Sequence, residues 1–213
     1  MLIASLPNLP PTFEVDRTPI TRERLNERLR LLHEEDAAVI DQVSAFLAWD
    51  RQPLDRSDQE VVTHYEQLME DIGNPLVREL INNRIDVRTI VTAIRRRRAD
   101  ATPPPGVGQW VDHIRRNWTQ PGFALAGRYP WIGEIERLIA QGNPMEAQRQ
   151  LFVEHWRDWS RMAERYTFSF EAVILYLARW EVIDRWTSRN AEAGQQRFEE
   201  LITETLGKYG NLY

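Results

Sequence analysis

The sequence contains no cysteine and only one lysine, Lys208, among its 213 residues. The lack of cysteine excludes disulfides, thiolate metal sites and cysteine nucleophiles, and it suits a reducing cytoplasm. Long apolar runs are also lacking. Residues 172–178 fall far short of the roughly 20 that span a bilayer, and the apolar start at 1–7 is too short for a secretion signal. We therefore expect a cytoplasmic protein without a membrane span.

The charge of the chain is acidic overall and its bases are almost all arginine. There are 26 arginines against 32 acidic residues, and the net charge is −5, which argues against a nucleic-acid binder. Arginine pairs bidentately with carboxylates and stacks on aromatic rings, and eight tryptophans are present. The composition therefore predicts ion-paired surfaces and aromatic packing.

Apolar residues recur at helical spacing along most of the chain, and no strand-like alternation follows the N-terminal hexapeptide. The sequence therefore predicts an all-α fold, an elongated bundle of about eight to nine helices. Asn74 and Pro75 form a helix start, as N-cap and first helical residue. The helices expected in the second half of the chain include 109–117, 130–141, 144–165, 169–189 and 191–209.

A proline-rich stretch interrupts this helical pattern once. Thr102 is followed by three prolines and then Gly106, a composition that favours a stiff, extended connection. We therefore predict a helical sub-bundle over 1–101, a hinge over 102–108, and a second helical sub-bundle over 109–213.

The helix expected over 76–98 concentrates positive charge, since residues 78–98 hold seven arginines and only two acids. Six of these arginines are candidates for binding a partner: Arg84, Arg88, Arg95, Arg96, Arg97 and Arg98. The run 95–98 is equally explained as a solvated helix end, because the helix dipole stabilises cations there. A docking site for an acidic protein surface or for anionic lipid headgroups is the functional alternative. Nucleic acid comes third, because no aromatic residue interrupts the run.

Three carboxylates are expected to need partners on apolar helix faces. Glu181 and Asp184 project from the same side of the 169–189 helix as large apolar residues, and an unpaired buried charge costs several kcal/mol. We predict structural ion pairing with arginine for both, and the same role for Asp86.

An aromatic stripe precedes that helix. Phe152, Trp156, Trp159 and Tyr166 recur at steps of three, four and seven residues, so they share one helix face. Core packing explains this stripe most simply. An exposed part of it would instead be a face that binds another protein.

Catalytic and metal-binding patterns are not found. The sequence has no P-loop, no dinucleotide fingerprint and no His-Glu-x-x-His. Its four histidines are far apart in sequence, and none follows a glutamate at the spacing of di-iron bundles. We therefore expect no catalytic residue, metal or cofactor, and a protein that is not an enzyme.

Two segments resemble the signatures of the C-type subunit of V/A-type (vacuolar-type) rotary ATPases, whose eukaryotic counterpart is the d-type subunit. Residues 85–95 are similar to Asp-Leu-x-Asn-Leu-x-x-Ile-Leu-Arg, with Thr89 in place of the asparagine. Residues 176–186 are similar to Tyr-Leu-x-x-Lys-Glu-x-Glu-Ile-x-Asn-Leu, with Trp180 and Val182 replacing acidic residues. The start of the chain, 2–7, resembles a short bacterial family associated with V-type ATPases.

The resemblance implies a fold like that of the C-type subunit, built from pseudo-repeated three-helix units, of which this shorter chain would hold about two. It also implies a non-catalytic connector between the central stalk and the rotor ring of a proton- or sodium-transporting ATPase. Its partners would be other ATPase subunits, met through Arg95 and its neighbours, with peripheral contact at the inner face of the membrane. The residues by themselves also allow a helical adaptor or regulatory protein that binds through the aromatic stripe.

Overall fold

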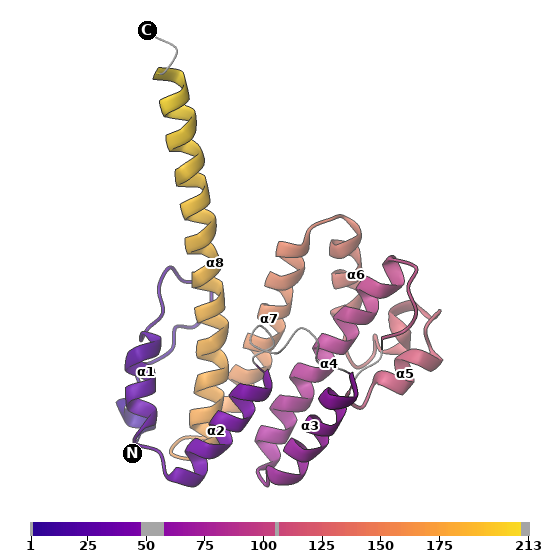
Figure 1. Cartoon of the computed structure of the whole chain (residues 1–213). Helices are drawn as coiled ribbons and strands as arrows, with labels where there is room; N and C mark the ends of the chain where they lie inside the picture. The colour runs from indigo at the N-terminus through magenta and orange to yellow at the C-terminus, as the bar shows by residue number, and fades with distance from the viewer. Residues whose placement is uncertain (1, 48–57, 105–106, 210–213) are drawn as a thin grey trace. The chain divides into compact units, whose positions relative to one another are not determined.

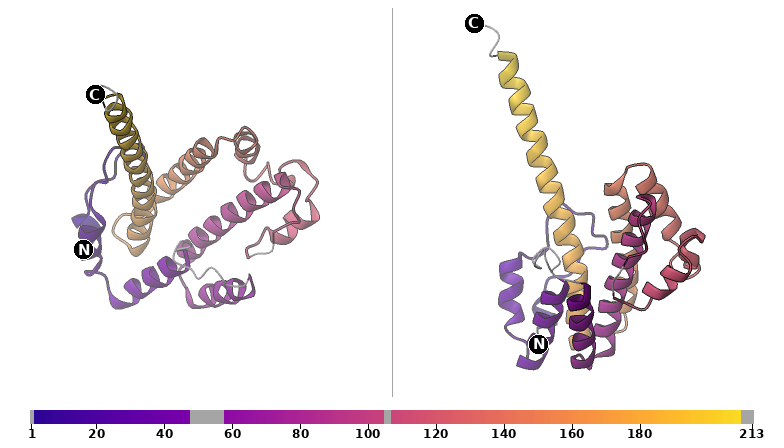
Figure 2. Two further views of the ribbon diagram at one scale, coloured as in Figure 1. Left: turned by 45° about the horizontal axis from the view of Figure 1, so that its top comes forward. Right: turned by 45° about the vertical axis from the view of Figure 1, so that its right-hand side comes forward.

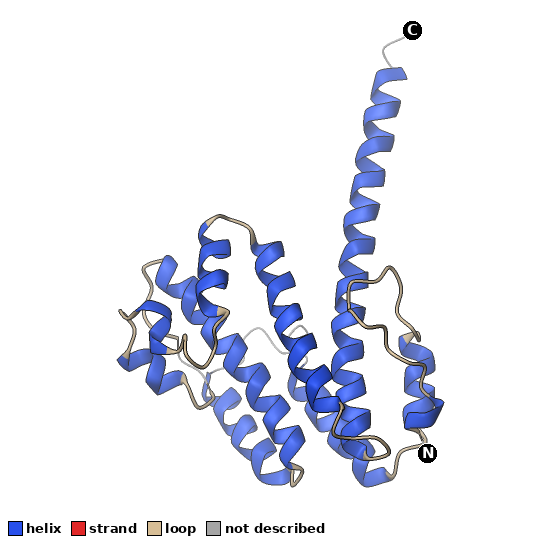
Figure 3. Ribbon diagram, turned by 180° about the vertical axis from the view of Figure 1, so that it is seen from behind, coloured by secondary structure: helices blue, strands red, loops and turns tan. Residues whose placement is uncertain are grey.

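The computed structural model describes residues 2–47, 58–104 and 107–209, and every regular element in these ranges is a helix (Figure 1, Figure 3). The predicted all-α class is confirmed, with eight α-helices in the described ranges. They are α1 (Arg22–Leu29), α2 (Glu34–Leu47), α3 (Asp58–Asp71), α4 (Pro75–Arg98), α5 (Val111–Arg116), α6 (Ile132–Ala140), α7 (Pro144–Ala163) and α8 (Phe170–Tyr209). Two short 3-10 helices, η1 (Ile3–Ser5) and η3 (Pro121–Ala124), lie in the connecting segments.

Helix α8 is continuous where the sequence predicts two helices. The expected break near residue 190 is absent from the backbone, which stays helical from Phe170 to Tyr209. No proline stands at this point, and an asparagine in a helix interior costs less than about 0.7 kcal/mol. This penalty is too small to end a helix whose neighbouring residues favour it.

The chain divides into two compact units at other places than the predicted hinge. Unit 1 comprises Met1–Leu31 and His155–Tyr213, and unit 2 comprises Leu32–Glu154. The predicted hinge, 102–108, lies inside unit 2, and its residues 105–106 are outside the described ranges. Helix α4 ends at Arg98, ahead of the prolines, where Asp100 has a positive φ of 51° and the N–H of Ala101 bonds back to the carbonyl of Arg96 at 2.9 Å. It packs against both α5 and α6, which follow the prolines (Figure 2). A short connection therefore returns the chain to the same core instead of starting a new one.

Helix α4 provides one side of the core of unit 2. Asn74 begins it as an N-cap, since its side-chain oxygen accepts hydrogen bonds from the backbone N–H groups of Leu76 (3.0 Å) and Val77 (3.2 Å). The fully buried side chains of this core come from α4, α5, η3 and α6: Ile90, Ala93, Ile114, Phe123, Ile132 and Ile135. The stripe Ile90–Ile94 of α4 therefore holds the later helices of unit 2 in place.

In unit 1 the irregular N-terminal segment is fixed to α7 and α8 by tryptophans. The indole N–H of Trp156 donates to the carbonyl of Pro11 (3.1 Å), and that of Trp180 donates to the carbonyl of Ile20 (2.9 Å). Phe13 is buried, with its ring edge-on to Trp186 at 5.3 Å between centroids. Because an indole can donate only one hydrogen bond, these two bonds set where the segment crosses each helix.

The N-cap of α4 provides a direct test of how this helix begins. Asn74→Ala removes the acceptor for two backbone N–H groups, so we expect the free energy of unfolding to fall by about 1 kcal/mol. Asn74→Asp is the matched control, because aspartate caps as well as asparagine. Urea unfolding followed by circular dichroism measures both, and an alanine variant as stable as the wild type would contradict the assignment.

Candidate functional site

The last turn of α4 carries the arginine run that the sequence marks as a candidate docking site. Arg97 donates from Nη1 to the backbone carbonyls of Trp118 (3.2 Å) and Gln120 (2.8 Å). Its Nη2 forms an ion pair with Glu136 of α6, and its guanidinium carbon lies 4.1 Å from the centre of the Phe123 ring. Arg97 therefore binds three separate parts of unit 2 at once.

Arg96 and Arg98, the neighbours of Arg97, also donate hydrogen bonds to segments that follow α4. Arg96 donates to the carbonyl and the hydroxyl of Thr102, at 2.7 and 3.2 Å, and so holds the turn that follows α4. Arg98 donates to the carbonyl of Ile139 in the last turn of α6. This carbonyl also accepts from the backbone N–H of Gly142 at 3.1 Å, so Arg98 adds a second donor at the end of α6.

The segment that Arg97 holds has an unusual backbone. Gly122, Phe123 and Ala124 all have positive φ, between 53° and 57°, a conformation that costs a residue other than glycine roughly 1–2 kcal/mol. Phe123 is fully buried, stacks on Trp118, and its carbonyl lies 3.1 Å from Nε2 of His113. Burial of the ring and the Arg97 contacts together offset the backbone strain.

The remaining arginines of the predicted site form a basic stripe along α4, defined as Arg84, Arg88 and Arg95. Arg88 and Arg95 are exposed, and Arg84 is half-buried. Spacings of four and seven residues place all three on one side of the helix. The structure thus separates the six predicted residues. Arg96, Arg97 and Arg98 hold unit 2 together, whereas partner binding stays a prediction for the basic stripe.

Asp86 is buried, with 2% of its surface exposed, but no arginine in the described ranges pairs with it. Its Oδ2 accepts hydrogen bonds from Nε2 of Gln109 (2.8 Å) and from the hydroxyl of Tyr129 (3.0 Å). Trp110 donates in turn to the Tyr129 oxygen at 3.0 Å. The prediction of an ion pair for Asp86 is therefore corrected, since neutral donors from the segments after the prolines bind its Oδ2. Its Oδ1 is buried without a hydrogen-bond partner.

The environment of Asp86 disfavours its charged form. Burial raises the pKa of Asp86 above its ordinary value, and the hydrogen bonds from Gln109 and Tyr129 oppose that rise only in part. Burial and the neighbouring Asp86 charge raise the pKa of Tyr129 to about 12. Gly108 passes closely over the site with φ of 110°, and a Cβ there would lie 2.8 Å from Ile85 and 3.4 Å from Oδ1 of Asp86. Position 108 therefore requires glycine, because any side chain would collide with Ile85.

The other two predicted carboxylates do pair with arginine. Asp184 of α8 forms an ion pair with Arg22 at the start of α1, and Arg22 also lies over the Trp180 ring at 4.9 Å. Glu181 pairs with Arg185 one turn further along α8, at 2.6 Å. Both pairs are partly exposed, so each is worth little more than a surface ion pair.

The aromatic stripe of α7 is core, as its spacing suggested. Phe152, Trp156 and Trp159 are buried, and Trp159 stacks on His155 at 4.7 Å between ring centroids. Tyr166, which follows the end of α7, is half-buried. The exposed aromatic face that the adaptor interpretation requires is therefore not present at Trp156 and Trp159.

Neither a metal site nor a membrane span is found in the described ranges. Within them, no three histidine, aspartate or glutamate side chains gather closely enough to hold a metal ion. Among the described helices, none combines the length and the apolar character that crossing a bilayer requires.

The chain is similar along almost its whole length to one family of proteins. A family model described as a protein of unknown function (DUF2764) matches residues 2–207. No curated protein and no solved structure matches the chain.

The role of Arg97 can be tested by its removal. Arg97→Ala leaves Glu136 without its cation and removes a donor from the carbonyls of Trp118 and Gln120, of which Gln120 still accepts from the N–H of Phe123. We therefore expect a loss of roughly 1–3 kcal/mol in the free energy of unfolding. Arg95→Ala changes the charge equally at an exposed position and should stay within about 0.5 kcal/mol of the wild type. Urea unfolding of both variants distinguishes them. Equal losses of stability in the two variants would contradict the proposed structural role of Arg97.

The raised pKa of Asp86 predicts a particular dependence on pH. The folded protein holds the Asp86 proton more tightly than the unfolded chain, so this group stabilises the protein at low pH and loses that contribution as pH rises through its raised pKa. Asp86→Asn keeps an acceptor oxygen but cannot ionise. We therefore expect the stability of D86N relative to wild type to increase between about pH 4 and pH 7, as measured by urea unfolding. A difference that is constant or decreases over this range would refute the assignment.

Proposed function

Because this chain belongs to the DUF2764 family, whose description gives no function, we propose one from its residues and its fold. We propose that it is a non-catalytic connector subunit or accessory protein of a V/A-type rotary ATPase, bound to the central stalk and the membrane rotor ring. In this role it would lie on the cytoplasmic side, in peripheral contact with the membrane, and serve proton or sodium transport without catalysing a reaction.

The observation that carries the proposal is the position of the two segments that resemble the C-type subunit. Residues 85–95 lie in α4 of unit 2, and residues 176–186 lie in α8 of unit 1. Each segment supplies buried side chains to its own unit, among them Ile85 and Ile90 in the first and Trp180 and Ile183 in the second. One signature-like segment per helical unit is the arrangement that a protein of repeated helical units would have.

The mechanical demands of a connector also agree with the interior of unit 2. Torque transmission needs helices that keep their relative positions under load, and α4, α5 and α6 share a core that Arg97 and Asp86 join with directed hydrogen bonds. Polar contacts of this kind fix one arrangement, because a shifted helix would leave buried groups unpaired.

The basic stripe supplies the proposed contact with an acidic partner. Arg88 and Arg95 are exposed on α4, in a chain whose net charge is −5. Charged groups at the rim of an interface steer association and select the partner more than they add affinity. We therefore assign to the basic stripe recognition of an acidic surface on a stalk or ring subunit.

Co-purification tests the proposed function. The tagged full-length chain, expressed in its native cells, should retain central-stalk or ring subunits when membranes are extracted at low salt, and mass spectrometry should identify them. Binding through charges should weaken as salt is raised. A chain that retains no rotary-ATPase subunit at low salt would contradict the proposal.

Charge reversal tests the basic stripe separately. Arg88→Glu with Arg95→Glu should lower the recovery of these subunits about tenfold, because like charges across an interface are repulsive. Arg17→Glu with Arg30→Glu makes the same change of charge at exposed positions in unit 1 and should leave recovery unchanged. Equal recovery with both double variants would exclude the basic stripe while leaving the ATPase assignment intact, and thermal unfolding confirms that each variant is folded.

A further inference from the structure

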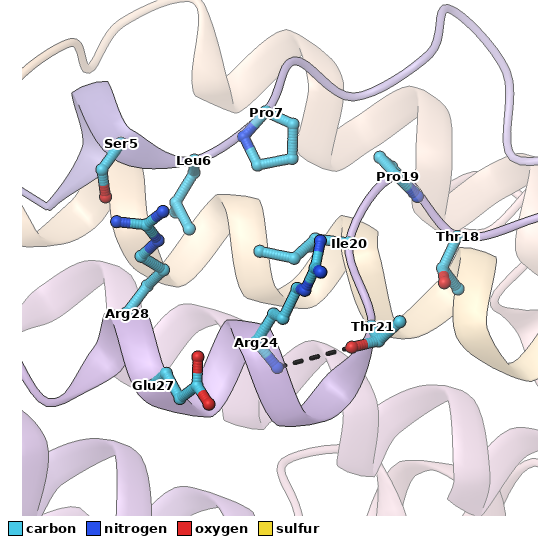
Figure 4. Close-up of a pocket in the computed structure, with 10 residues that line it drawn as sticks. All are labelled: Ser5, Leu6, Pro7, Thr18, Pro19, Ile20, Thr21, Arg24, Glu27 and Arg28. Atoms are coloured by element: carbon cyan, nitrogen blue, oxygen red, sulfur yellow. Dashed lines mark hydrogen bonds between the residues drawn. The ribbon is translucent and has the colours of Figure 1, made fainter.

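A hollow of about 530 Å³ lies in unit 1, between α1 and the N-terminal segment. Figure 4 shows the residues that line it. Its polar lining consists of Ser5, Thr18, Thr21, Arg24, Glu27 and Arg28. These residues are separate from the basic stripe and from the contacts of α4, so what they bind does not depend on the proposed function.

The walls of the hollow are held by contacts within unit 1. The Ser5 hydroxyl donates to the carbonyl of Leu2 at 2.7 Å, and Leu6 is buried. On the opposite wall, Ile20 accepts the indole hydrogen bond of Trp180, and Thr21 caps α1 by accepting from the N–H of Arg24. Both walls are thus anchored, so a ligand would find the site already formed.

Two arginines line this hollow, one beside Ser5 and Leu6 and the other beside Ile20 (Figure 4). Arg24 and Arg28 are one turn apart on α1, and both side chains extend from the helix toward the N-terminal segment (Figure 4). Glu27 is the one acid among the lining residues that the structure describes, and no ion pair there joins it to either arginine. By contrast, Arg137 and Arg149 each pair with a glutamate three residues earlier on their own helix.

Arg24 and Arg28 are both exposed, and their arrangement favours an anion. Like charges four residues apart on a helix repel each other, and a shared anion would remove that repulsion. Each guanidinium offers a fork of N–H donors. The hydroxyl of Thr21 can still donate, since its oxygen is engaged as an acceptor, and Thr18 adds a second hydroxyl.

From this geometry we propose that the hollow binds a phosphate group through Arg24 and Arg28. A carboxylate has two oxygens, which a single guanidinium fork occupies. A phosphate has further oxygens and a larger charge, so it can satisfy both arginines and a threonine hydroxyl together. The hollow is larger than inorganic phosphate and has room for the group that carries it. A free phosphate and the headgroup of an anionic phospholipid present this same chemistry.

Two binding measurements on the full-length chain distinguish these sources. Isothermal titration with inorganic phosphate measures the free anion. Co-sedimentation with phosphatidylcholine vesicles, with and without phosphatidic acid, measures the headgroup. Saturable binding of phosphate identifies a soluble ligand, whereas binding only to vesicles that contain phosphatidic acid identifies a lipid headgroup. Either result supports the site.

Matched variants connect the binding to the hollow. Arg24→Gln with Arg28→Gln should weaken binding at least about tenfold, because charge-assisted hydrogen bonds are lost. Arg17→Gln with Arg30→Gln removes the same charge from exposed positions outside the hollow and should bind as the wild type does. Arg24→Lys with Arg28→Lys keeps the charge without the fork, so it should bind more weakly than the wild type even if the glutamine variant fails to fold. A wild-type chain that binds neither probe, or arginine variants that bind as tightly as the wild type, would overturn the proposal.

Discussion

Unit 2 depends on the contacts that the last turn of α4 makes with the segments after the proline-rich stretch. Arg97 holds two carbonyls, Glu136 and the face of the Phe123 ring, and Phe123 itself sits in a strained backbone conformation. A strained turn persists only where its surroundings determine it. The buried ring and the guanidinium above it provide that determination, so Arg97 and the apolar core together fix the fold of 118–124 and the position of α6.

A second polar connection joins the middle of α4 to the same part of the chain. Asp86 accepts hydrogen bonds from Gln109 and Tyr129, and Gly108 lets the backbone pass close to the carboxylate. Because these donors are neutral, the charge of the carboxylate is compensated only in part, by the nearby Arg128. The inner side of α4 makes these contacts, and Arg88 and Arg95 lie exposed on the same helix. In unit 1 the tryptophan hydrogen bonds fix the N-terminal segment, and Arg24 and Arg28 line the hollow between this segment and α1.

Local patterns are sufficient to predict some of these features and insufficient for the rest. The all-α class, the start of α4 at Asn74 and the buried stripe of α7 follow from helical spacing and capping, which neighbouring residues decide. The sequence indicates that Asp184 needs an arginine partner. It does not indicate that this partner is Arg22, which lies near the other end of the chain. The partners of Asp86 and Arg97 lie 21 to 43 residues away and include neutral side chains and backbone carbonyls, which carry no sequence signal. The unit boundaries differ from the predicted hinge because a proline stretch in a connection does not decide which core the next helix joins.

The energetic coupling between Arg97 and Glu136 tests most directly whether the end of α4 organises unit 2. A double-mutant cycle compares Arg97→Ala, Glu136→Ala and the combined variant by urea unfolding, and it isolates the interaction from the separate effects of each truncation. We predict a favourable coupling energy of at least about 0.5 kcal/mol, because the two half-buried groups interact directly. Single effects that add to within about 0.3 kcal/mol would show that the end of α4 is not held by this contact, and the arginine run would then have to be explained as a surface feature.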